Sequence, residues 1–407
     1  MAGILDGIRV IDWTIMQVGP YAGAMLADMG AEVIHVEQPG SGDPVRGLKE
    51  TWGVSLELPG GRNTFFEEHN RNKRSIALDL KLPEAREVLH RLVSRADVFL
   101  TNYRARAVKR LEMDYKTLVQ HNPKLIYAQA SGFGLKGPEA DAASLDLAIM
   151  ARSGAMMASG EEGSPPVILP IGVGDRIASS YLAYGIVAAL YHRERTGEGQ
   201  QLHVSQLQSL MVLQGNMVMV PMLLGKELPR HNRHHPPRSV LHNYYRCRDG
   251  RWIVFSVVRG SNPWPAFCRA VGRPEWETDP RFATEAARQR HREELVALLD
   301  ELFATKTFDE WNRILREQAD MVFCVANTMS ELMEDPQVVA NDYKVPWDHP
   351  VLGHIRFNCF PVDFEKTPLT YRLPAPELGE HTEDVLARMG GYSAQDLEKL
   401  RKAGVFG

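Results

Sequence analysis

The chain has 407 residues, 44% of them hydrophobic and 24% charged, a composition typical of a folded globular protein rather than a disordered one. Its formal net charge of −4 argues against general nucleic-acid binding, which needs a dense basic surface. The most apolar run, 207–224, is interrupted by polar residues and a proline, and no signal peptide is visible, so we expect a cytoplasmic protein without a membrane span. Four scattered cysteines and a short histidine-rich stretch lack the spacing of a metal site, and none is predicted.

The first two hundred residues alternate predicted strands and helices. Strands are expected at 8–11, 33–36, 75–78, 98–100, 125–130 and 201–204, and helices follow from about Pro20, Pro83, Tyr115 and Ile177. This alternation predicts a doubly wound α/β domain, in which helices cover both faces of a parallel sheet. The loop after the first strand lacks the GxGxxG pattern, which disfavours a nicotinamide-dependent dehydrogenase.

The alternation stops after residue 205, which we take as the end of the first part of a large domain, 1–205. Residues 206–239 are rich in methionine and then in basic residues, and they are interpreted as a linker. An Asp-Gly turn between 244–246 and 252–255 predicts a hairpin, and Thr307 to Glu310 forms a capping box. We therefore expect a smaller α+β domain over 240–325, followed by a tail, 326–407, with short helices starting at Thr382 and Ser393.

Asp175 ends the stretch Gly172-Val173-Gly174-Asp175 and opens a predicted long helix that finishes near Gly197. Aspartate is a preferred N-cap, so the local sequence predicts a structural role first. The same position also suits a carboxylate nucleophile, because a helix N-terminus favours the anion by roughly 0.3–1 kcal/mol. An ionised Asp175 would need no general base. Asp146, upstream, is interpreted either as another cap or as a residue that orients Asp175.

Basic residues cluster in two short stretches that flank predicted strand ends, where doubly wound sheets bind ligands. The two stretches contain Arg71, Lys73, Arg74 and Lys81, and then Arg104, Arg106, Lys109 and Arg110 beside Asn102 and Tyr103. On an acidic protein they are interpreted either as a site for an anionic ligand or as a solvated basic face.

Eight short motifs occur in order between Leu5 and about Leu386. They are 5–12, 17–20, 26–34, 40–43, 72–76, 172–175, 196–200 and 378–382. Together they resemble the family III CoA-transferases, the CaiB/BaiF group that includes the formyl-CoA:oxalate and carnitine CoA-transferases. Each motif is weak alone, but the ordered set is specific.

The resemblance implies a Rossmann-like large domain that the C-terminal part, within 326–407, completes, with the small domain inserted between. It also implies an interlocked dimer, in which two chains thread through each other. A homodimer is expected, and a heteromer with a related chain, as in a benzylsuccinate-type CoA-transferase, is the alternative.

Asp175 matches the family's catalytic aspartate, which attacks an acyl-CoA donor to form an acyl anhydride and then an aspartyl-CoA thioester. A carboxylic acid acceptor reverses these steps. Gln17 matches a glutamine beside the reacting centre. Leu78, Lys81, Asn102, Tyr103 and Arg110 match positions that hold the nucleotide end of coenzyme A, whose phosphates suit Lys and Arg. Coenzyme A thioesters are thus substrates, and no permanently bound cofactor is implied.

The principal alternative shares the fold. The α-methylacyl-CoA racemases keep the aspartate but need a second acid/base group, a histidine in a Gly-His-Asp stretch. This chain reads Ser144-Leu145-Asp146 there, which disfavours racemisation. Two other positions depart from the family pattern: 257–263 replaces a glycine-rich loop, and Gln38 stands where some relatives have a basic residue.

Two interpretations concern the acid that is transferred. The apolar residues Met211, Met217, Met219, Met222 and Leu223 either line an acyl pocket or, as our default, belong to the core. Arg233, Arg238 and Arg259 are hypothesised to hold the second carboxylate of a dicarboxylic acceptor such as a succinate derivative.

Overall fold

The computed structural model describes residues 3–169, 172–236, 239–257, 262–319, 321–358, 360–369 and 371–407. The chain forms two compact units. The large unit comprises Met1–Met156, Ile168–Lys226 and Tyr343–Gly407, and the small unit comprises Met157–Val167 and Glu227–Asp342. These bounds differ from the expected ones, because residues 206–224, interpreted as linker, form two helices of the large unit.

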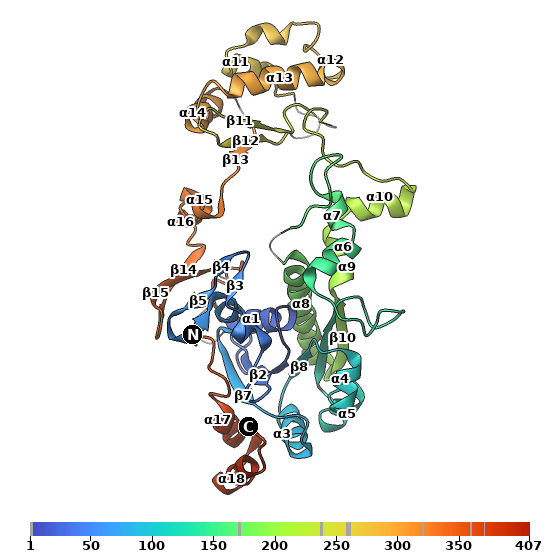
Figure 1. Ribbon diagram of the computed structural model, residues 1–407, viewed down its shortest axis with the longest axis vertical. Helices are drawn as coiled ribbons and strands as arrows, with labels where there is room; N and C mark the ends of the chain where they lie inside the picture. The colour runs from blue at the N-terminus through green and yellow to red at the C-terminus, as the bar shows by residue number, and fades with distance from the viewer. Residues whose placement is uncertain are drawn as a thin grey trace. The chain divides into compact units, whose positions relative to one another are not determined.

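A six-stranded sheet forms the centre of the large unit (Figure 1). Its strands are β1 (Arg9–Trp13), β2 (Glu32–Glu37), β7 (Lys73–Ala77), β8 (Val98–Thr101), β9 (Ile126–Ser131) and β10 (Gln200–Ser205). The order is β10-β9-β8-β1-β2-β7, and every neighbouring pair is parallel. The predicted parallel sheet is confirmed. The chain places β2 and β7 on one side of β1 and then β8, β9 and β10 on its other side, so the strand order reverses between β1 and β8. Doubly wound sheets bind ligands outside the carboxyl ends of the strands at such a point.

The two faces of the sheet have separate cores, because successive strand side chains point to opposite faces. On one face, Val10 and its neighbours pack against α1 (Val18–Asp28) and α8 (Val173–Thr196). On the other, Ile11 and its neighbours pack against α3 (Pro83–Val93), α5 (Tyr115–His121) and the C-terminal elements. Helix α8 is thus fixed along its length by the sheet that ends beside its N-terminus.

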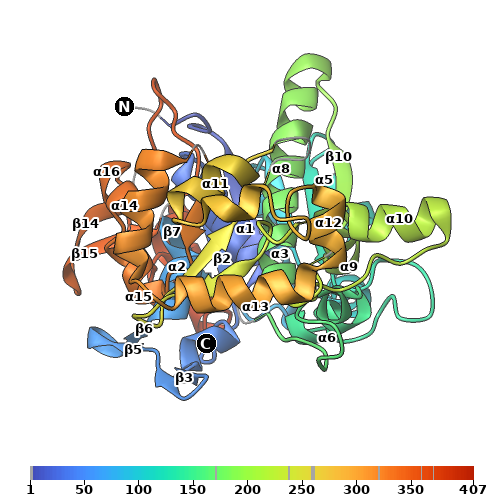
Figure 2. The ribbon, with the colours of Figure 1, turned by 90° about the horizontal axis from the view of Figure 1, so that it is seen from above.

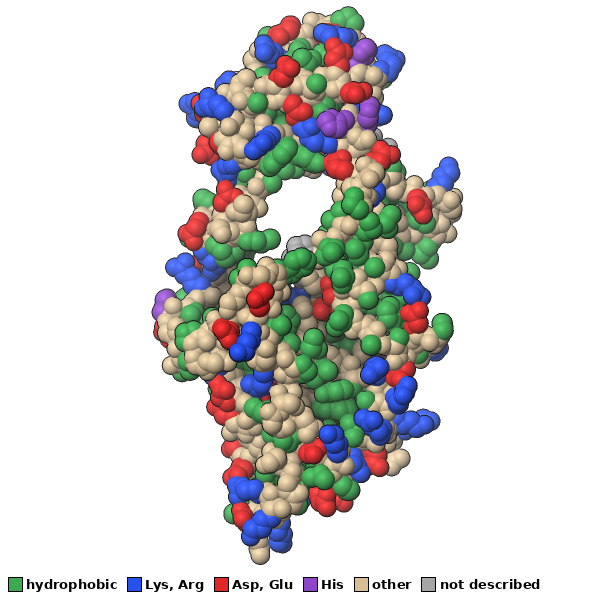
Figure 3. All heavy atoms as spheres, in the orientation of Figure 1, with side chains coloured by type: hydrophobic (Ala, Val, Ile, Leu, Met, Phe, Trp, Pro, Cys, Tyr) green, Lys and Arg blue, Asp and Glu red, His purple; other side chains and the backbone are tan. Residues whose placement is uncertain are grey.

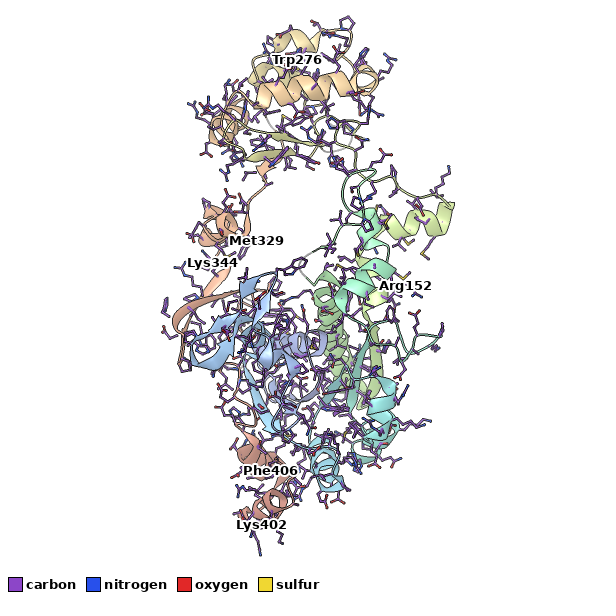
Figure 4. The ribbon with its side chains drawn as sticks, viewed as in Figure 1. Arg152, Trp276, Met329, Lys344, Lys402 and Phe406 are labelled. Atoms are coloured by element: carbon purple, nitrogen blue, oxygen red, sulfur yellow. The ribbon has the colours of Figure 1, made fainter. Side chains whose placement is uncertain are left out.

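The last segment of the chain belongs to the core of the large unit. It contains α17 (Thr382–Val385), η4 (Leu386–Gly390) and α18 (Ala394–Lys402), and Val405 is fully buried. The N–H of Asp79 donates to the carbonyl of Val405 at 2.9 Å, and the N–H of His381 donates to that of Ser75 at 2.9 Å. Phe406, labelled in Figure 4, packs against the same core. Backbone hydrogen bonds therefore join β7 and the residues after it to the C-terminal segment.

The large unit has further helices and short strands outside the central sheet. They are η1 (Pro44–Gly47), β3 (Glu50–Thr51), β4 (Val54–Ser55), β5 (Glu57–Leu58), η2 (Pro59–Gly61), β6 (Arg62–Asn63), α2 (Thr64–Asn70), α4 (Ala105–Arg110), α6 (Asp146–Arg152), α9 (Gln206–Leu213), α10 (Asn216–Leu224), β14 (Lys344–His349) and β15 (Gly353–Asn358). The short helix α7 (Ala155–Ala158) spans the boundary between the units.

Helix α10 projects away from the rest of the large unit (Figures 1 and 2), and none of its residues is buried. Figure 3 shows hydrophobic side chains at the surface where α6, α9 and α10 lie. The exposed ones on these helices are Leu147, Met211, Val212, Leu213, Met219, Met222, Leu223 and Leu224. The default assignment of this methionine-rich stretch to the core is wrong for the single chain. Within the described ranges no single helix is long and apolar enough to cross a membrane, and the bent pair α9 and α10 meets those criteria only jointly.

The small unit is an α+β unit with its own core. Its antiparallel sheet has the order β11 (Tyr244–Arg246), β12 (Trp252–Phe255), β13 (Phe323–Val325), so the predicted hairpin is present. Its helices are α11 (Trp264–Ala270), η3 (Pro274–Glu277), α12 (Glu285–Arg290), α13 (Arg292–Phe303), α14 (Phe308–Gln318), α15 (Met329–Met333) and α16 (Pro336–Ala340). The predicted capping box of Thr307 and Glu310 opens α14. Trp276, labelled in Figure 4, lies in a core dominated by aromatic rings.

Candidate active site

Asp175 is the third residue of α8 and does not cap it. Gly172 occupies the N-cap position with φ 58°, a left-handed conformation that glycine adopts without strain. Oδ1 of Asp146, at the start of α6, accepts the backbone N–H of Asp175 at 3.0 Å and thus supplies the cap from another helix. A Cβ on Gly174 would lie 2.7 Å from this oxygen, which explains the glycine there. The prediction that Asp175 is a cap is wrong, and its carboxylate is free for other contacts.

Each carboxylate oxygen of Asp175 has an amide donor. Gln206 Nε2 donates to Oδ1. In the amide orientation that gives both of its polar atoms a partner, Gln17 donates from Nε2 to Oδ2 at 3.2 Å, and its Oε1 accepts from Arg176 Nε at 3.1 Å. Gln17 was predicted beside the reacting centre, whereas Gln206 was missed. Its position directly after the end of β10 was the available signal, since ligands gather at strand ends.

The surroundings of Asp175 favour its neutral form more than expected. Burial, followed by the negative charge of Asp146, raises the pKa of Asp175 to about 7, although Arg176 and the Gln206 hydrogen bond oppose the shift. The expectation that the helix N-terminus alone keeps this carboxylate ionised is therefore corrected, because burial and the charge of Asp146 raise its pKa. Arg176 offers limited compensation, since its guanidinium also pairs with Glu68 at 2.8 Å.

The loop that carries Gln17 is fixed by two side chains from other segments. The amide of Asn102, just after β8, donates to the carbonyl of Ile15 at 2.7 Å and accepts its N–H at 3.0 Å. The carboxylate of Asp43 accepts the N–H of Met16 at 3.1 and 3.2 Å, and Met16 has a φ of 68°, unusual for a residue other than glycine. Asn102 was predicted to hold the nucleotide end of coenzyme A. Here its amide shapes the loop beside Asp175.

Two residues of the predicted basic clusters are buried in ion pairs. Lys73 Nζ donates to Asp12 Oδ2 at 2.8 Å, to the Pro20 carbonyl at 2.8 Å and to Asn70 Oδ1 at 3.0 Å, and it is fully buried. Arg71 pairs with Asp28 at 2.6 Å and is also fully buried. For these two residues both interpretations of the cluster, as an anion site and as a solvated face, are wrong.

Three cavities lie along the carboxyl edge of the sheet and share lining residues. The first, about 180 Å³, is lined by Ile15, Met16, Gln17, Val18, Phe65, Asn102, Ala130, Ser131, Gly132, Ser144, Leu145, Asp175 and Gln206. The second, about 190 Å³, shares Asn102 with the first and contains Tyr103 and Arg104. The third, about 410 Å³, shares Tyr103 with the second. The shared residues make the three spaces neighbours in a row.

Four of the five residues predicted to hold the nucleotide line the third cavity. Leu78, Lys81, Tyr103 and Arg110 line it, with Trp13, Glu37, Gln38, Leu80 and Leu111. Tyr103 stacks on the ring of Trp13, with the ring centroids 4.2 Å apart, and this stacking fixes it between the second and third cavities. The row of cavities thus runs from a carboxylate at one end to two cationic side chains at the other.

Asp175 is the one ionisable side chain among the described residues that line the first cavity. Leu145, which replaces the histidine of the racemases, lines the same cavity and is 67% exposed. Proton removal and return on opposite faces of a carbon needs two titratable groups. This arrangement instead suits a single carboxylate that acts as a nucleophile.

Comparison with known sequences identifies the family of the chain. Residues 5–382 match the family described as CoA-transferase family III. The chain belongs to this family. The transferase is 34% identical over 403 residues to the cinnamoyl-CoA:phenyllactate CoA-transferase of Clostridium sporogenes, covering 98% of this chain and 96% of that protein. It is 32% identical over 407 residues to the (R)-2-hydroxy-4-methylpentanoate CoA-transferase of Clostridioides difficile, covering 99% of each.

Solved structures give the same result. A CAIB/BAIF family protein from Brucella suis has a TM-score of 0.84 at 30% identity, and the match covers 96% of the transferase and 100% of that chain. The Mycobacterium tuberculosis protein Rv3272 has a TM-score of 0.79 at 30% identity, with 94% and 99% covered.

One of the three arginines hypothesised to hold the second carboxylate of a dicarboxylic acceptor lies among the described residues, and its guanidinium is already paired. Arg233 belongs to the small unit, where its guanidinium binds Asp300 through both terminal nitrogens and its Nε donates to the carbonyl of Tyr244 at 3.1 Å. Arg238, Arg259 and residues 258–261 of the altered loop lie outside the described residues. The part of the transferase that the structure describes contains no group of three metal-ligating side chains that could hold an ion.

Proposed function

We propose that this CoA-transferase moves coenzyme A from an acyl-CoA donor to a free carboxylic acid through covalent intermediates on Asp175. The observation that carries the proposal is the position of this carboxylate. Among the described residues that line its cavity it is the one ionisable group, each of its oxygens has an amide donor, and a row of cavities leads from it to Lys81 and Arg110.

The reaction begins when ionised Asp175 attacks the thioester carbon. The new C–O bond replaces the C–S bond, the thiolate of coenzyme A leaves, and an acyl anhydride remains on the enzyme. The thiolate then attacks Cγ of Asp175 and expels the first acid as its carboxylate, which leaves an aspartyl-CoA thioester. The acceptor carboxylate repeats both steps in the opposite direction. No proton is transferred in any step, so no second acid or base is needed.

Coenzyme A fits the row of cavities in one direction. Its phosphates suit the third cavity, where Lys81 and Arg110 are available as cationic donors and Leu78 and Tyr103 offer apolar surface. Its narrow pantetheine arm then passes through the second cavity, and its sulfur reaches Asp175 in the first. Asn102 acts at the reacting end of this path, because it holds the loop of Gln17.

The first cavity favours an acid with one carboxylate and an apolar remainder. Its lining contains no lysine or arginine among the described residues, and Phe65, Val18 and Leu145 provide apolar surface. The relatives from Clostridium sporogenes and Clostridioides difficile are named for acids with one carboxylate, phenyllactate and 2-hydroxy-4-methylpentanoate, whose side chains beyond the 2-hydroxyl group are apolar. A panel that compares these acids with dicarboxylates tests this preference, and a higher kcat/KM for the dicarboxylates would contradict it.

The assembly proposed is an interlocked homodimer. The presence of Asp175 with amide donors from Gln17 and Gln206 of the same chain supports a homodimer over a heteromer, and the exposed apolar surface of α9 and α10 supports burial against another chain. The solution mass should be twice the 45.7 kDa of one chain. A monomer with full activity would contradict it.

Mass spectrometry tests the covalent route. The transferase is incubated with a panel of acyl-CoAs and then with hydroxylamine, which converts an anhydride or thioester of aspartate to a hydroxamate. The modification should lie on the peptide that contains Asp175. Asp175→Ala should lose both the modification and the transfer activity. Asp141→Ala is the control, because that carboxylate pairs with Arg106 at 3.2 Å outside the first cavity. Full transfer in Asp175→Ala would overturn the proposal.

A further inference from the structure

We propose that Gln206 is a catalytic residue of this transferase: its side-chain amide stabilises the negative charge that develops on Oδ1 of Asp175 when a nucleophile attacks Cγ. The inference rests on the proposed covalent route and adds a residue to it. The contact that motivates it is the hydrogen bond from Gln206 Nε2 to Asp175 Oδ1.

The fold restricts the position of the Gln206 side chain. Gln206 is the first residue of α9, directly after β10, and is 5% exposed. Ser205, the preceding residue, caps the helix by accepting the N–H of Gln208 at 3.2 Å. The backbone that carries Gln206 is therefore fixed at the end of a strand of the central sheet, and regular elements hold a side chain more precisely than loops do.

The orientation of the amide is also fixed. The ionised carboxylate of Asp175 can only accept, so Nε2 of Gln206 is the atom turned to it, and Oε1 lies 3.5 Å from Ser144 Oγ, from which it can accept. Ser144 in turn packs against Gly132, whose missing side chain leaves the space that the hydroxyl occupies. Gly132, Ser144 and Gln206 form a supporting chain that ends at the carboxylate.

The two amides around Asp175 differ in their surroundings. Gln17 is partly exposed and lies on the loop, whereas Gln206 is buried. We assign Oδ1, on the buried side, as the oxygen that stays on Asp175 as its carbonyl, and Oδ2 as the oxygen that forms the bond to the acyl group. Gln17 is then the donor nearest to the substrate.

The charge balance explains what Gln206 contributes. When the thiolate attacks Cγ of the anhydride, a C–S bond forms and the carbonyl electron pair moves onto Oδ1. Collapse of this intermediate restores the carbonyl, breaks the bond from Cγ to the bridging oxygen and releases the acid. The same charge appears on Oδ1 when the acceptor carboxylate attacks the aspartyl-CoA thioester. A preorganised donor at this oxygen stabilises both transition states.

The test follows the aspartyl-CoA adduct directly. Gln206→Met keeps the approximate volume and removes the donor. After rapid mixing with an acyl-CoA, intact-protein mass spectrometry separates the acyl adduct from the CoA adduct. Loss of one oxyanion donor typically lowers rates about 10²- to 10³-fold, so the CoA adduct should form at least about 100-fold more slowly in the variant. Coenzyme A affinity and the thermal midpoint should stay close to those of the unchanged enzyme.

Gln208→Met is the matched control, because Gln208 lies on the same helix, is exposed and does not line the first cavity. Ser144→Ala is a second variant, which removes the support of Gln206 while leaving both residues of the contact in place. It should slow CoA-adduct formation by a smaller factor, roughly 3- to 10-fold, the size of one neutral hydrogen bond.

The outcomes separate the two proposals. Formation of the CoA adduct at the unchanged rate in Gln206→Met overturns the assignment of Gln206. So does an equal loss of coenzyme A affinity and adduct rate, which indicates a structural role. If the unchanged enzyme transfers coenzyme A and forms neither adduct, the covalent route itself is wrong.

Discussion

The carboxylate of Asp146 accepts the backbone N–H of Asp175 at 3.0 Å, so one aspartate caps the helix that carries the other. This arrangement leaves the Asp175 side chain free to meet a substrate. It also places a second negative charge near the nucleophile, and burial together with this charge raises the pKa of Asp175 to about 7. The same contact therefore supports the structure and tunes the chemistry.

The first prediction concerns pH. Asp175 must be deprotonated to attack, so kcat/KM for the donor should rise with pH through an apparent pKa near 7. Asp146→Asn keeps an oxygen that can cap α8 and removes the charge, so the rise should shift to lower pH. A pH–rate profile of both enzymes checks this. An unchanged inflection in Asp146→Asn would show that Asp146 does not set the ionisation of Asp175.

The second prediction concerns folding stability. A carboxyl whose pKa is higher in the folded than in the unfolded protein binds more protons when folded. Its ionisation therefore lowers stability as pH rises from about 3.8, the ordinary value, to about 7. Asp175→Asn removes this cost and should melt at a higher temperature than the unchanged enzyme, with a larger difference at pH 8 than at pH 5. Thermal melts at the two pH values measure it, and a difference independent of pH would contradict it.

The third prediction concerns coenzyme A. Lys81→Ala and Arg110→Ala each remove a cation from the third cavity, so KM for the acyl-CoA should rise roughly 10-fold with kcat nearly unchanged. Arg106→Ala is the control, because its side chain is 84% exposed, pairs with Asp141 and does not line that cavity. Initial-rate kinetics distinguish the variants. Equal KM values for all three variants would contradict the proposal that coenzyme A binds in the third cavity.

The sheet was predictable because its strands are short apolar runs separated by helix signals that lie nearby in sequence. The burial of Arg71 and Lys73 was not predictable. Their partners, Asp28 and Asp12, are 43 and 61 residues away, and a basic cluster looks the same in sequence whether it is solvated or paired. The central sheet determines those contacts, and only its strand order reveals them.

Site residues around Asp175 could be predicted from the sequence where they lie in a family motif. Gln17 and Asp175 both lie in such motifs, and the structure brings them together. Gln206 lies in none and was placed at the start of a presumed linker. The methionine-rich run and Pro221 obscured the helices α9 and α10, and with them the strand-end position of Gln206.

The fourth prediction concerns the buried network. Lys73→Met removes a cation paired with buried Asp12 and leaves His35 as its other neighbour, and a buried charge that loses an ionic partner typically costs about 3–5 kcal/mol in the free energy of unfolding. Lys49→Met is the control, since Lys49 and Glu57 form an exposed pair, for which about 0–1 kcal/mol is usual. Urea denaturation compares them. Equal losses would mean that the Asp12–Lys73 pair does not stabilise the fold.

The most direct test of the covalent route follows the carboxylate oxygens of the acceptor acid. With an acceptor acid labelled with ¹⁸O on its carboxylate, the anhydride step transfers one acid oxygen to the aspartate in each turnover. After a single turnover, mass spectrometry should find one ¹⁸O in the peptide that contains Asp175 and one in the acyl-CoA product. Turnover that leaves this peptide unlabelled, with both oxygens accounted for elsewhere, would contradict the central claim that Asp175 is the nucleophile.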